Sequence, residues 1–529
     1  MGEEICAGFV LIVLYLCMLT VTSAHPGEFL SIHCGAKLPY TDELGIKWVL
    51  DDEYVKTGEN WETQVSDHNE SSIQLNSFRY FPNSRTKNCY VLPVDPSSTY
   101  LLRVRLFPGK GSSQTTSPLT LPMDFSVTVN SNEWFSYSAL NESDRAPILY
   151  ESVFFSFERS VAYLCLLQGR NRPFINSIEL RGLPPKSYWD FSTRRRRIMV
   201  LGERINTGTA PEDKTIIRYP DDEYDRFWWP TSTRKFPDYK RFEGSWKNLS
   251  FTRYPDNASY SYYDEFYNNY TPNKTIIIAW VGRNLTFGIT KERPGLQKIE
   301  VTVYTKDLEP GVNITKDNPA GPLFGFPGAE QLQAQNLTDT VDFFWQDALY
   351  FDYDNISYTV ASAPWFKRDV FLNAFEWYYS YDINLNATFS EDIITLNTLR
   401  ESFDLQDWTG DPCYPVAWNW LTCDPNTTRV QTLMLSNMNI SGTIPENISS
   451  LAGLTEMHLG NNSIHGSIPP SMVSLTNLRI LALDNNKLTG DIPLAFQNKA
   501  GFTFNGNPGL CIPQGSRCNS ISAAPSQQE

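Results

Sequence analysis

Two stretches of the sequence combine aromatic rings with carboxylates, which are the groups that bind sugars. A sugar is held when its C–H bonds stack on a flat aromatic face while carboxylates or amides accept hydrogen bonds from its hydroxyl groups. Residues 224–230 and residues 260–267 both provide these groups. The candidate ligand-binding residues are Tyr224, Asp225, Trp228, Trp229, Tyr260, Tyr262, Tyr263 and Asp264.

Each stretch also has a structural interpretation. Residues 224–230 would pack the opening turn of a second domain, and this is the interpretation that we favour for them. The second stretch lies among the glycan acceptors Asn257, Asn269 and Asn273, which suggests an exposed loop. The basic run 194–197 is either a processing site for a basic-specific protease or a solvated stretch that enters the next strand.

The sequence shows none of the reactive arrangements that are typical of enzymes. A glycosidase needs two carboxylates that face each other across a cleft, but the adjacent Asp221 and Asp222 would point to opposite sides of a strand. We find no Gly-x-Ser-x-Gly motif, phosphate-binding loop or metal triad. Because there is no Cys-x-x-Cys pair and there are only five histidines, we expect no metal site, and we expect no cofactor.

The elements that position these residues should be β-strands. The chain has 529 residues, of which 41% are hydrophobic, and this is enough for two to four domains with separate cores. Aromatic residues make up 14%, with 27 Tyr and 14 Trp, which is typical of extended β surfaces more than of helical bundles. A net charge of −15 would repel phosphate backbones, so we do not expect a nucleic-acid partner.

The N-terminus indicates secretion. The apolar run 5–22 is followed by small residues up to Ala24, which is typical of a signal peptide over residues 1–24. The run is preceded by Glu3 and Glu4 instead of basic residues, so an uncleaved N-terminal anchor is the alternative. We expect the chain to be secreted or to lie on the outer face of the plasma membrane, either complete or as the outer part of a longer protein.

An excess of Asn-x-Ser/Thr acceptors also indicates the secretory pathway. The chain has 15 of them, where random neighbours would give roughly six. The expected glycosylation sites are Asn69, Asn141, Asn248, Asn257, Asn269, Asn273, Asn284, Asn313, Asn336, Asn355, Asn386, Asn426, Asn439, Asn447 and Asn461.

Cysteine spacing predicts disulfides. The short-range pairs are Cys413–Cys423 and Cys511–Cys518. Once Cys6 and Cys17 are removed with the signal peptide, three further cysteines lie far apart in the N-terminal part, so one disulfide there leaves one thiol over. We expect Cys34 to pair with Cys89, which leaves Cys165 free.

A repeat with a period of 24 residues lies near the C-terminus. Segments starting at Val430, Leu454 and Leu478 share the same apolar pattern, and a Gly-x-Ile-Pro element follows in each turn. This is a leucine-rich repeat, in which each turn needs a stacked neighbour to bury its apolar side chains. We expect three repeats over residues 429–500, followed by a C-terminal cap and tail over residues 501–529.

The repeat also predicts an internal row of asparagines. Asn462 and Asn486 occupy the position at which an inward-pointing Asn satisfies backbone groups in the bend. In the first turn this position is Met438, so the row should be interrupted there. Before the repeats, residues 393–403 have apolar residues at helical spacing, and residues 390–428 should form this helix and an N-terminal cap.

The N-terminal part contains a weaker duplication. Asp-Asp-Glu-Tyr at 51–54 recurs at 221–224, and Phe-Ile-Asn-Ser-Ile-Glu at 174–179 recurs as Phe-Leu-Asn-Ala-Phe-Glu at 371–376. Because both echoes occur in the same order, we expect two tandem β domains. The expected domains are residues 28–185 and residues 195–385.

Two motifs resemble a known family. Trp-Thr-Gly-Asp-Pro-Cys at 408–413 is similar to the Gly-Asp-Pro-Cys junction between a malectin-like region and leucine-rich repeats in plant receptor-like kinases. Ile-His-Cys-Gly at 32–35 resembles the opening Ile-Asp-Cys-Gly of this family, with His33 in place of Asp. The resemblance implies a mainly β fold, with two tandem malectin-like β-sandwich domains followed by a short leucine-rich-repeat solenoid with disulfide caps.

The resemblance also implies a function. The chain would be the extracellular recognition module of a receptor-like protein that binds a cell-wall oligosaccharide or a secreted peptide. Its leucine-rich repeats would act as a spacer and as the docking face for a co-receptor kinase. The alternatives are a secreted structural or inhibitor protein that binds another protein, and a glycan-active enzyme.

Overall fold

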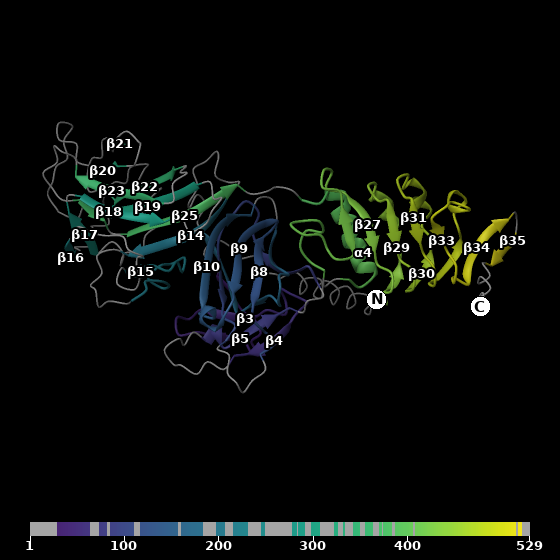
Figure 1. Ribbon diagram of the computed structural model, residues 1–529, viewed down its shortest axis with the longest axis horizontal. Helices are drawn as coiled ribbons and strands as arrows, with labels where there is room; N and C mark the ends of the chain where they lie inside the picture. Colours follow the sequence, from purple (N-terminus) through teal and green to yellow (C-terminus); the bar gives the residue numbers. More distant parts are fainter. Residues whose placement is uncertain are drawn as a thin grey trace, which may run out of the picture.

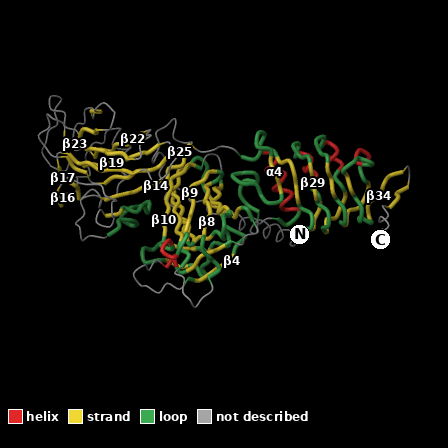
Figure 2. Tube along the Cα trace, viewed as in Figure 1, coloured by secondary structure: helices red, strands yellow, loops and turns green. Residues whose placement is uncertain are grey.

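The computed structural model is mainly β. Figure 1 shows a β-rich body joined to an elongated solenoid, and Figure 2 shows how little helix accompanies the strands. The structure describes residues 29–63, 73–81, 85–109, 117–156, 160–183, 197–206, 215–230, 387–405, 408–514 and 517–520, together with strand segments between residues 245 and 382.

The β-rich body consists of two halves. The strands of the first half are β1 (Phe29–His33), β2 (Tyr40–Thr41), β3 (Lys47–Leu50), β4 (Glu59–Glu62), β5 (Ser77–Tyr80), β6 (Lys87–Pro93), β7 (Thr99–Leu106), β8 (Met123–Val129), β9 (Asn132–Ala139), β10 (Ile148–Phe155), β11 (Val161–Leu167), β12 (Phe174–Ile175) and β13 (Ser177–Leu183). The strands of the second half are β14 (Arg197–Asn206), β15 (Trp229–Pro230), β16 (Ser245–Asn248), β17 (Ile278–Gly282), β18 (Asn284–Thr290), β19 (Lys298–Lys306), β20 (Pro322–Gly325), β21 (Leu332–Gln333), β22 (Asp342–Leu349), β23 (Asn355–Ser362), β24 (Val370–Leu372) and β25 (Ala374–Asp382).

The two halves share one topology. In the first half β1, β13, β7 and β10 lie side by side, and β14, β25, β19 and β22 repeat this order in the second. Strand β3 runs parallel to β1, just as β15 runs parallel to β14. The remaining sheets also correspond, since β6-β11-β8-β9 is repeated as β18-β23-β20-β21 and β12-β5-β4 as β24-β17-β16.

A single sheet connects the halves. Strand β10 pairs with β14 through Ser152 opposite Val200 and Val153 opposite Met199. The pairing joins the main sheets of both halves into one 11-stranded sheet. The halves are therefore joined by backbone hydrogen bonds, not only by side-chain contacts.

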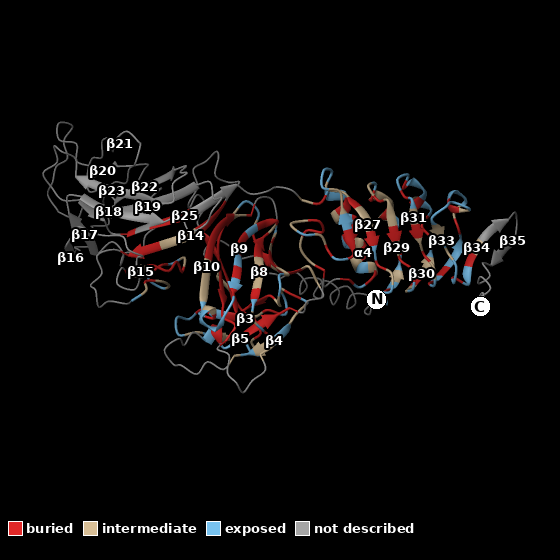
Figure 3. Cartoon of the chain, in the orientation of Figure 1, coloured by how far each residue is buried: buried red, intermediate tan, exposed pale blue. Residues whose placement is uncertain are grey.

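Both faces of this sheet are buried in the first half. Leu102, Val104, Ile178 and Leu180 point into the main hydrophobic core. The opposite face of β7 and β13 includes the charged residues Arg103, Arg105, Glu179 and Arg181, which are buried as well because other parts of the chain cover this outer face. Figure 3 shows many buried residues in the strands of the first half.

The sequence echoes correspond only partly to equivalent positions. The Phe-x-Asn-x-x-Glu echo is structural, since Glu179 on β13 and Glu376 on the equivalent β25 are both fully buried. In the Asp-Asp-Glu-Tyr echo, the buried carboxylates are those of Asp51 and Asp222, which are the first and the second residue of the motif. The two copies of Asp-Asp-Glu-Tyr therefore do not align residue by residue.

The predicted pairing of Cys34 with Cys89 is wrong. The structure joins Cys89 to Cys165, and Cys34 is a buried free thiol. Strand pairing decides this outcome, because Cys89 on β6 lies directly opposite Cys165 on β11. Cys34 follows β1 in a different sheet, and burial raises the pKa of its thiol well above the usual value.

The solenoid begins with a helix and continues as two parallel sheets. The helix α4 (Ser390–Ser402) includes most of the segment expected to be helical, and Leu396 and Leu399 bury its inner face. The strands are β26 (Leu421–Cys423), β27 (Val430–Met434), β28 (Ser441–Thr443), β29 (Glu456–His458), β30 (Ser463–Ser467), β31 (Ile480–Ala482), β32 (Lys487–Asp491), β33 (Phe502–Thr503), β34 (Gly509–Gln514) and β35 (Arg517–Ser520). The short 3-10 turns η6 (Glu446–Ser450), η7 (Pro470–Ser474) and η8 (Leu494–Phe496) form the opposite side.

A row of asparagines holds the turns together. The side chain of Asn462 donates to the carbonyl oxygens of Leu435, Leu459 and Gly460 at 2.8, 2.9 and 3.2 Å. Its carbonyl oxygen accepts from the N–H groups of Met438 at 3.1 Å and of Ile440 at 3.2 Å in the first turn, where no asparagine occupies the equivalent position. One turn later, the side chain of Asn486 donates to the carbonyl oxygens of Leu459, Leu483 and Asp484, and its own carbonyl oxygen accepts from the Ile464 N–H.

The row extends one turn beyond the prediction. Asn507 is fully buried, and its side chain donates to the carbonyl oxygens of Leu483 and Phe504, both at 2.9 Å. Strand β33 adds to β31 and β34 adds to β32, both in parallel. The segment expected to be only a cap therefore begins with a fourth, shortened turn.

We predict that Asn486→Ala destabilises the solenoid by about 3 kcal/mol or more, because several buried backbone groups would lose their partner at about 1–3 kcal/mol each. Hydrogen exchange of the solenoid amides measures the effect. The matched control is Asn477→Ala, which removes one exposed hydrogen bond to Ala452 and should change stability by less than about 1 kcal/mol. Equal exchange in both variants would contradict a structural role for this row.

Candidate recognition surface

The first predicted ligand-binding stretch is folded against the sheet. Ile217 and Trp228 are joined by backbone hydrogen bonds that close the segment into a loop. The Asp222 carboxylate accepts hydrogen bonds from Arg226 Nε at 3.0 Å and from Trp228 Nε1 at 2.7 Å. These contacts fix the loop from inside.

The loop inserts one carboxylate among the arginines of the outer sheet face. Asp225 is fully buried, and its Oδ2 lies 2.9 Å from Arg181 Nη2 and 3.4 Å from Arg103 Nη1. Its Oδ1 lies 2.8 Å from Arg218 Nη2. The backbone carbonyl oxygen of Asp225 also accepts from Arg103 Nη2 at 2.6 Å.

Glu179 is the second carboxylate of this network. It lies 2.7 Å from Arg105, 2.9 Å from Arg103 and 2.8 Å from Arg181. Burial alone would raise the pKa of Glu179, but these arginines outweigh that effect and hold the pKa well below its usual range. Glu179 is therefore an anion with three cationic partners.

The network reaches the second half through Arg204 on β14. Arg204 Nη1 lies 2.8 Å from Glu151 Oε1 on β10, and Arg204 Nε lies 2.7 Å from Glu376 Oε2 on β25. Tyr378 accepts a hydrogen bond from Arg204 at 2.7 Å and donates one to Glu376 at 2.9 Å. The charged side chains of both halves thus form one continuous network of ion pairs and hydrogen bonds.

These contacts correct the prediction for two of the candidate residues. Asp225 and Trp228 are fully buried, so neither can contact a ligand at the surface. Tyr224 and Trp229 are half-buried in the same loop, next to apolar residues of the sheet. The favoured interpretation of residues 224–230 as packing for the second half agrees with this geometry.

The other candidate residues Tyr260, Tyr262, Tyr263 and Asp264 lie outside the described residues. So do residues 194–196 of the basic run, whereas Arg197 begins strand β14, opposite Asp382.

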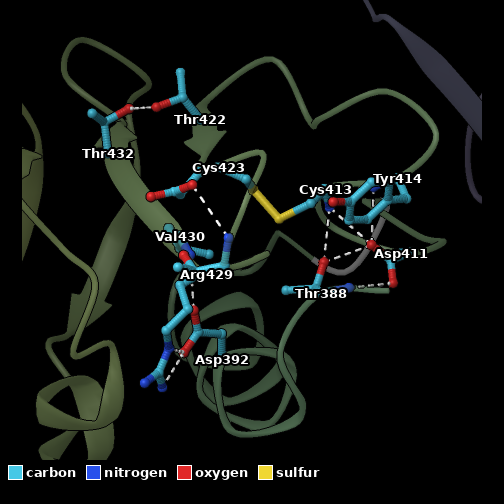
Figure 4. The surroundings of a disulfide bond; sticks show 12 residues. Thr388, Asp392, Asp411, Cys413, Tyr414, Thr422, Cys423, Arg429, Val430 and Thr432 are labelled. Carbon is cyan, nitrogen blue, oxygen red and sulfur yellow. Dashed lines mark hydrogen bonds and ion pairs between the residues drawn. A yellow bond between two sulfur atoms is a disulfide. The ribbon is translucent and has the colours of Figure 1, made fainter. Parts of the chain in front are cut away.

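The solenoid cap is organised by two aspartates (Figure 4). Asp411 accepts hydrogen bonds from the Thr388 hydroxyl at 2.5 Å and from the backbone N–H groups of Cys413 and Tyr414 at 3.0 and 2.9 Å. Asp392 of α4 accepts from the Val430 N–H at 2.8 Å, which ties the helix to the first solenoid strand.

Disulfides occur at both ends of the solenoid. Cys413 and Cys423 are joined, as their spacing indicated. Cys511 is also disulfide-bonded, and the side chain of Cys518 lies outside the described residues.

The strands β27, β29 and β31 belong to one sheet of the solenoid, and we call the side of this sheet that points away from the core the inner strand face. This face is open to solvent. Leu433, Met457 and Leu481 point inward and are fully buried, so their strand neighbours point outward. His458 Nε2 lies 3.1 Å from Glu456 Oε2, and Met434 is 45% exposed. The outward-pointing residues of β27, β29 and β31 are Thr432, Met434, Glu456, His458, Ile480 and Ala482.

We did not predict this face from the sequence, although the 24-residue period contains the signal for it. Once the inward leucines are aligned, the residues between them form the outward rows. None of the 15 glycan acceptors lies in these three strands. Sugar chains therefore do not emerge from the inner strand face.

The described glycan acceptors differ in accessibility. Asn141, Asn426, Asn439 and Asn461 are exposed, whereas Asn447 is half-buried. The Asn447 amide donates to Thr398 Oγ1 at 3.0 Å, and its carbonyl oxygen is buried. Asn248, Asn284 and Asn355 lie in strands β16, β18 and β23. Asn69, Asn257, Asn269, Asn273, Asn313, Asn336 and Asn386 lie outside the described residues.

Two negative findings concern the described part of the chain. No group of three or more His, Cys, Asp or Glu side chains there is arranged to hold a metal ion. No helix within the same residues has the length and hydropathy needed to cross a membrane.

Comparisons with known proteins match both parts of the molecule. Residues 32–278 match the malectin-like domain family, and residues 428–488 match the leucine-rich repeat family. A probable leucine-rich-repeat receptor-like serine/threonine-protein kinase of Arabidopsis thaliana is 27% identical over 457 residues, which cover 82% of this chain and 45% of the relative. The chain thus contains a malectin-like region and leucine-rich repeats, and its relatives are receptor-like kinases.

Other relatives agree with this assignment. The probable receptor-like kinase PAM74 of Arabidopsis thaliana is 24% identical over 469 residues, which cover 81% of this chain and 47% of the relative. The chain thus spans about half the length of the curated family members that it matches.

Solved structures show the same fold. The ANX2 ectodomain from Arabidopsis thaliana matches with a TM-score of 0.52 and 16% identity, over 67% of this chain and 97% of that one. The ANXUR1 extracellular domain from the same plant matches with a TM-score of 0.51 and 16% identity, again over 67% and 97%. The malectin-like ectodomain fold therefore accounts for about two thirds of the chain.

We predict that Asp225→Asn destabilises the β-rich body by about 3–5 kcal/mol, because it removes the charge shared by the buried Arg103 and Arg181 and the half-buried Arg218. Urea unfolding followed by circular dichroism measures the change. The matched control is Asp221→Asn in the same loop, which is exposed and should alter stability by less than about 0.5 kcal/mol. If Asp225→Asn left stability unchanged but abolished sugar binding, this carboxylate would be a ligand contact after all.

We also predict which acceptors carry glycans. Asn426, Asn439 and Asn461 should be occupied, and Asn447 should not, because a glycan on its amide nitrogen would displace Thr398. Peptide mapping of the protein secreted from plant cells checks this. Full occupancy at Asn447 in the folded protein would show that the contact between α4 and η6 is formed differently.

Proposed function

We propose that the chain is the extracellular recognition module of a receptor-like protein. In this proposal each β half is one malectin-like sandwich domain, and the solenoid, closed at both ends by disulfide-bonded caps, is the docking face for a protein partner. The chain would act in the apoplast, or at the outer face of the plasma membrane as part of a longer protein.

One observation carries the proposal. The two β halves are locked into a single sheet by paired strands and buried ion pairs, and beside them the solenoid leaves its inner strand face open and free of glycan acceptors. A rigid body that presents an accessible face suits binding, because little conformational entropy is lost when a partner docks. A stable protein contact needs about 800 Å² on each partner, so the face would act together with neighbouring surface.

The favoured ligand is a secreted peptide. The aromatic and carboxylate groups of residues 224–230, which suited a sugar best, are occupied by the contacts between the halves. A solved structure with a TM-score of 0.50 and 15% identity contains the plant peptide RALF23 in complex with FER and LLG2. A cell-wall oligosaccharide is the alternative ligand, for which the candidate residues 260–267 are left.

The partner at the solenoid would be a co-receptor kinase. Its contact surface would be the outward rows of β27, β29 and β31, in which Met434 and Ile480 provide apolar contacts beside the polar pair of Glu456 and His458. Apolar groups surrounded by polar ones are typical of protein–protein interfaces.

Biolayer interferometry on the immobilised glycosylated chain tests the proposal. The probes are a panel of synthetic secreted plant peptides, with RALF23 among them, and a series of cello-oligosaccharides. We expect saturable binding of at least one peptide and none of the oligosaccharides up to millimolar concentration. Saturable oligosaccharide binding, or their hydrolysis during the measurement, would refute the peptide assignment.

A further inference from the structure

Three buried polar side chains on the outer face of the first half have no partner for one of their polar atoms among the described residues. They are Ser31, His33 and Ser177, which are 1%, 4% and 0% exposed. The atoms concerned are Ser31 Oγ, His33 Nδ1 and Ser177 Oγ. Because buried polar atoms in folded proteins are nearly always hydrogen-bonded, three such atoms at one place indicate a bound water or a bound ligand.

Strand register brings these side chains together. Ser31 and His33 flank Ile32 on β1, which points into the core, so both face outward. His33 lies directly opposite Ser177 on β13, and Ser177 lies directly opposite Arg105 on β7. The three groups therefore surround one place on the sheet, beside Arg105.

Arg105 supplies hydrogen-bond donors at this place. Its Nη1 lies 2.7 Å from Glu179 Oε1, but the contact lacks hydrogen-bond geometry, and the Arg105 side chain has no hydrogen bond to any other described residue. The guanidinium lies 6.0 Å from the centre of the Trp48 ring and 5.9 Å from that of Phe227. A guanidinium whose N–H groups are not used within the protein is available to a carboxylate.

The ion-pair network of the outer face has more positive than negative charge. Arg204, which also contacts Glu151, has its own carboxylate partner in Glu376. The remaining described members are four arginines that share three carboxylates, namely Arg103, Arg105, Arg181 and Arg218 against Glu151, Glu179 and Asp225. The nearby Asp42 is not part of this network, because its carboxylate accepts from Trp48 Nε1 at 3.0 Å and from two backbone N–H groups. A carboxylate brought by a ligand would balance the fourth arginine.

The position of the ring hydrogen on His33 follows from its neighbour Ser77. The Ser77 hydroxyl donates its single hydrogen to the Cys34 carbonyl oxygen at 3.0 Å. Ser77 Oγ therefore accepts from His33 Nε2 at 3.1 Å, so Nε2 carries the ring hydrogen. Burial lowers the pKa of His33 to about 4, so the ring is neutral above about pH 5 and Nδ1 is a hydrogen-bond acceptor.

We propose that this outer-face site, formed by Ser31, His33, Arg105 and Ser177, binds the C-terminal residue of a peptide. Arg105 and the two serine hydroxyls donate to the terminal carboxylate, and His33 Nδ1 accepts from the backbone N–H of the same residue. The choice of a peptide rests on the proposed function, although the site is separate from the inner strand face. A uronic acid also carries a carboxylate, but within a polysaccharide it is linked on both sides and needs an open groove, whereas these buried groups admit only a chain end.

Tyr40 covers the site and has to move for a ligand to enter. Its ring lies 5.7 Å from the ring of His33 and stacks on Trp48 at 6.1 Å, with 7° between the planes. Tyr40 is half-buried and belongs to β2, a strand of two residues at the edge of the sheet that pairs with β3 through two residue pairs. Few backbone contacts therefore hold the cover in place.

NMR of the full-length glycosylated chain with isotopically labelled histidine tests the site. The chain has five histidines, and the His33 signal is identified by its loss in His33→Gln. The probes are N-acetylglycylglycine, which ends in a carboxylate, and its C-terminal amide. We expect the acid alone to shift the His33 signal, saturably and without a shift of His458. Equal shifts with both probes, or no shift with the acid, would overturn the proposal.

Two serine variants separate binding from folding. Ser31→Ala and Ser177→Ala each remove a hydroxyl that has no partner among the described residues, so the urea midpoint should stay the same or rise. The affinity for the acid probe should nevertheless fall by about tenfold, because a hydrogen bond to a charged group is lost. The matched control Ser77→Ala removes a hydroxyl with two partners and should lower the urea midpoint. Unchanged affinity in both variants would show that the serines hold only buried water, and the site would be refuted.

Failure of this site can be told apart from failure of the proposed peptide recognition. Every peptide that binds in the interferometry panel is measured again with an amidated C-terminus. Equal affinity of the acid and the amide would leave peptide recognition in place and overturn this site. If no peptide of the panel binds, the acid probe still decides the site by itself. A stronger His33 shift with galacturonic acid than with the acid probe would assign the carboxylate to a polysaccharide and overturn the peptide source.

Discussion

Asp225 supplies the negative charge that allows the outer sheet face of the first half to be covered. Arg103, Arg181 and Arg218 converge on it, and without it their charges would be buried with too few partners. Removing ions from water is costly and is offset only where the partners are placed accurately, so a network of this kind tolerates one relative position of the two halves. The edge pairing of β10 with β14 is compatible with that position. The buried ion pairs and this strand pairing together produce the 11-stranded sheet.

Local patterns in the sequence were sufficient to predict the solenoid. All three turns share the inward apolar pattern, and the second and third turns share the asparagine, so the contacts of Asn462 and Asn486 are implied by position alone. The fourth turn was missed because it is shorter, and Asn507 follows Asn486 after 21 residues instead of 24. The helix α4 was also predictable from its spacing, although it begins three residues before the expected start.

Pairings between distant residues were not predictable in the same way. Cys89 and Cys165 are 76 residues apart, and only the register of β6 against β11 shows that they face each other. The candidate site failed for a related reason. A sugar platform and a packed interdomain loop both need aromatic rings beside carboxylates, so residues 224–230 have the same composition in either case. The arginines of β7 and β13 decide between the two cases, and they lie more than 40 residues away along the chain.

The asparagine row has a consequence for how such a solenoid can change in length. Each asparagine bonds only to its own turn and to the preceding one, so the pattern is complete within each pair of neighbouring turns. Insertion or loss of one whole turn would leave the bonding at both ends intact, and the end-to-end length would change in equal steps. The N-terminal cap would keep its contacts, while the distance from this cap to the C-terminal end of the solenoid would increase or decrease.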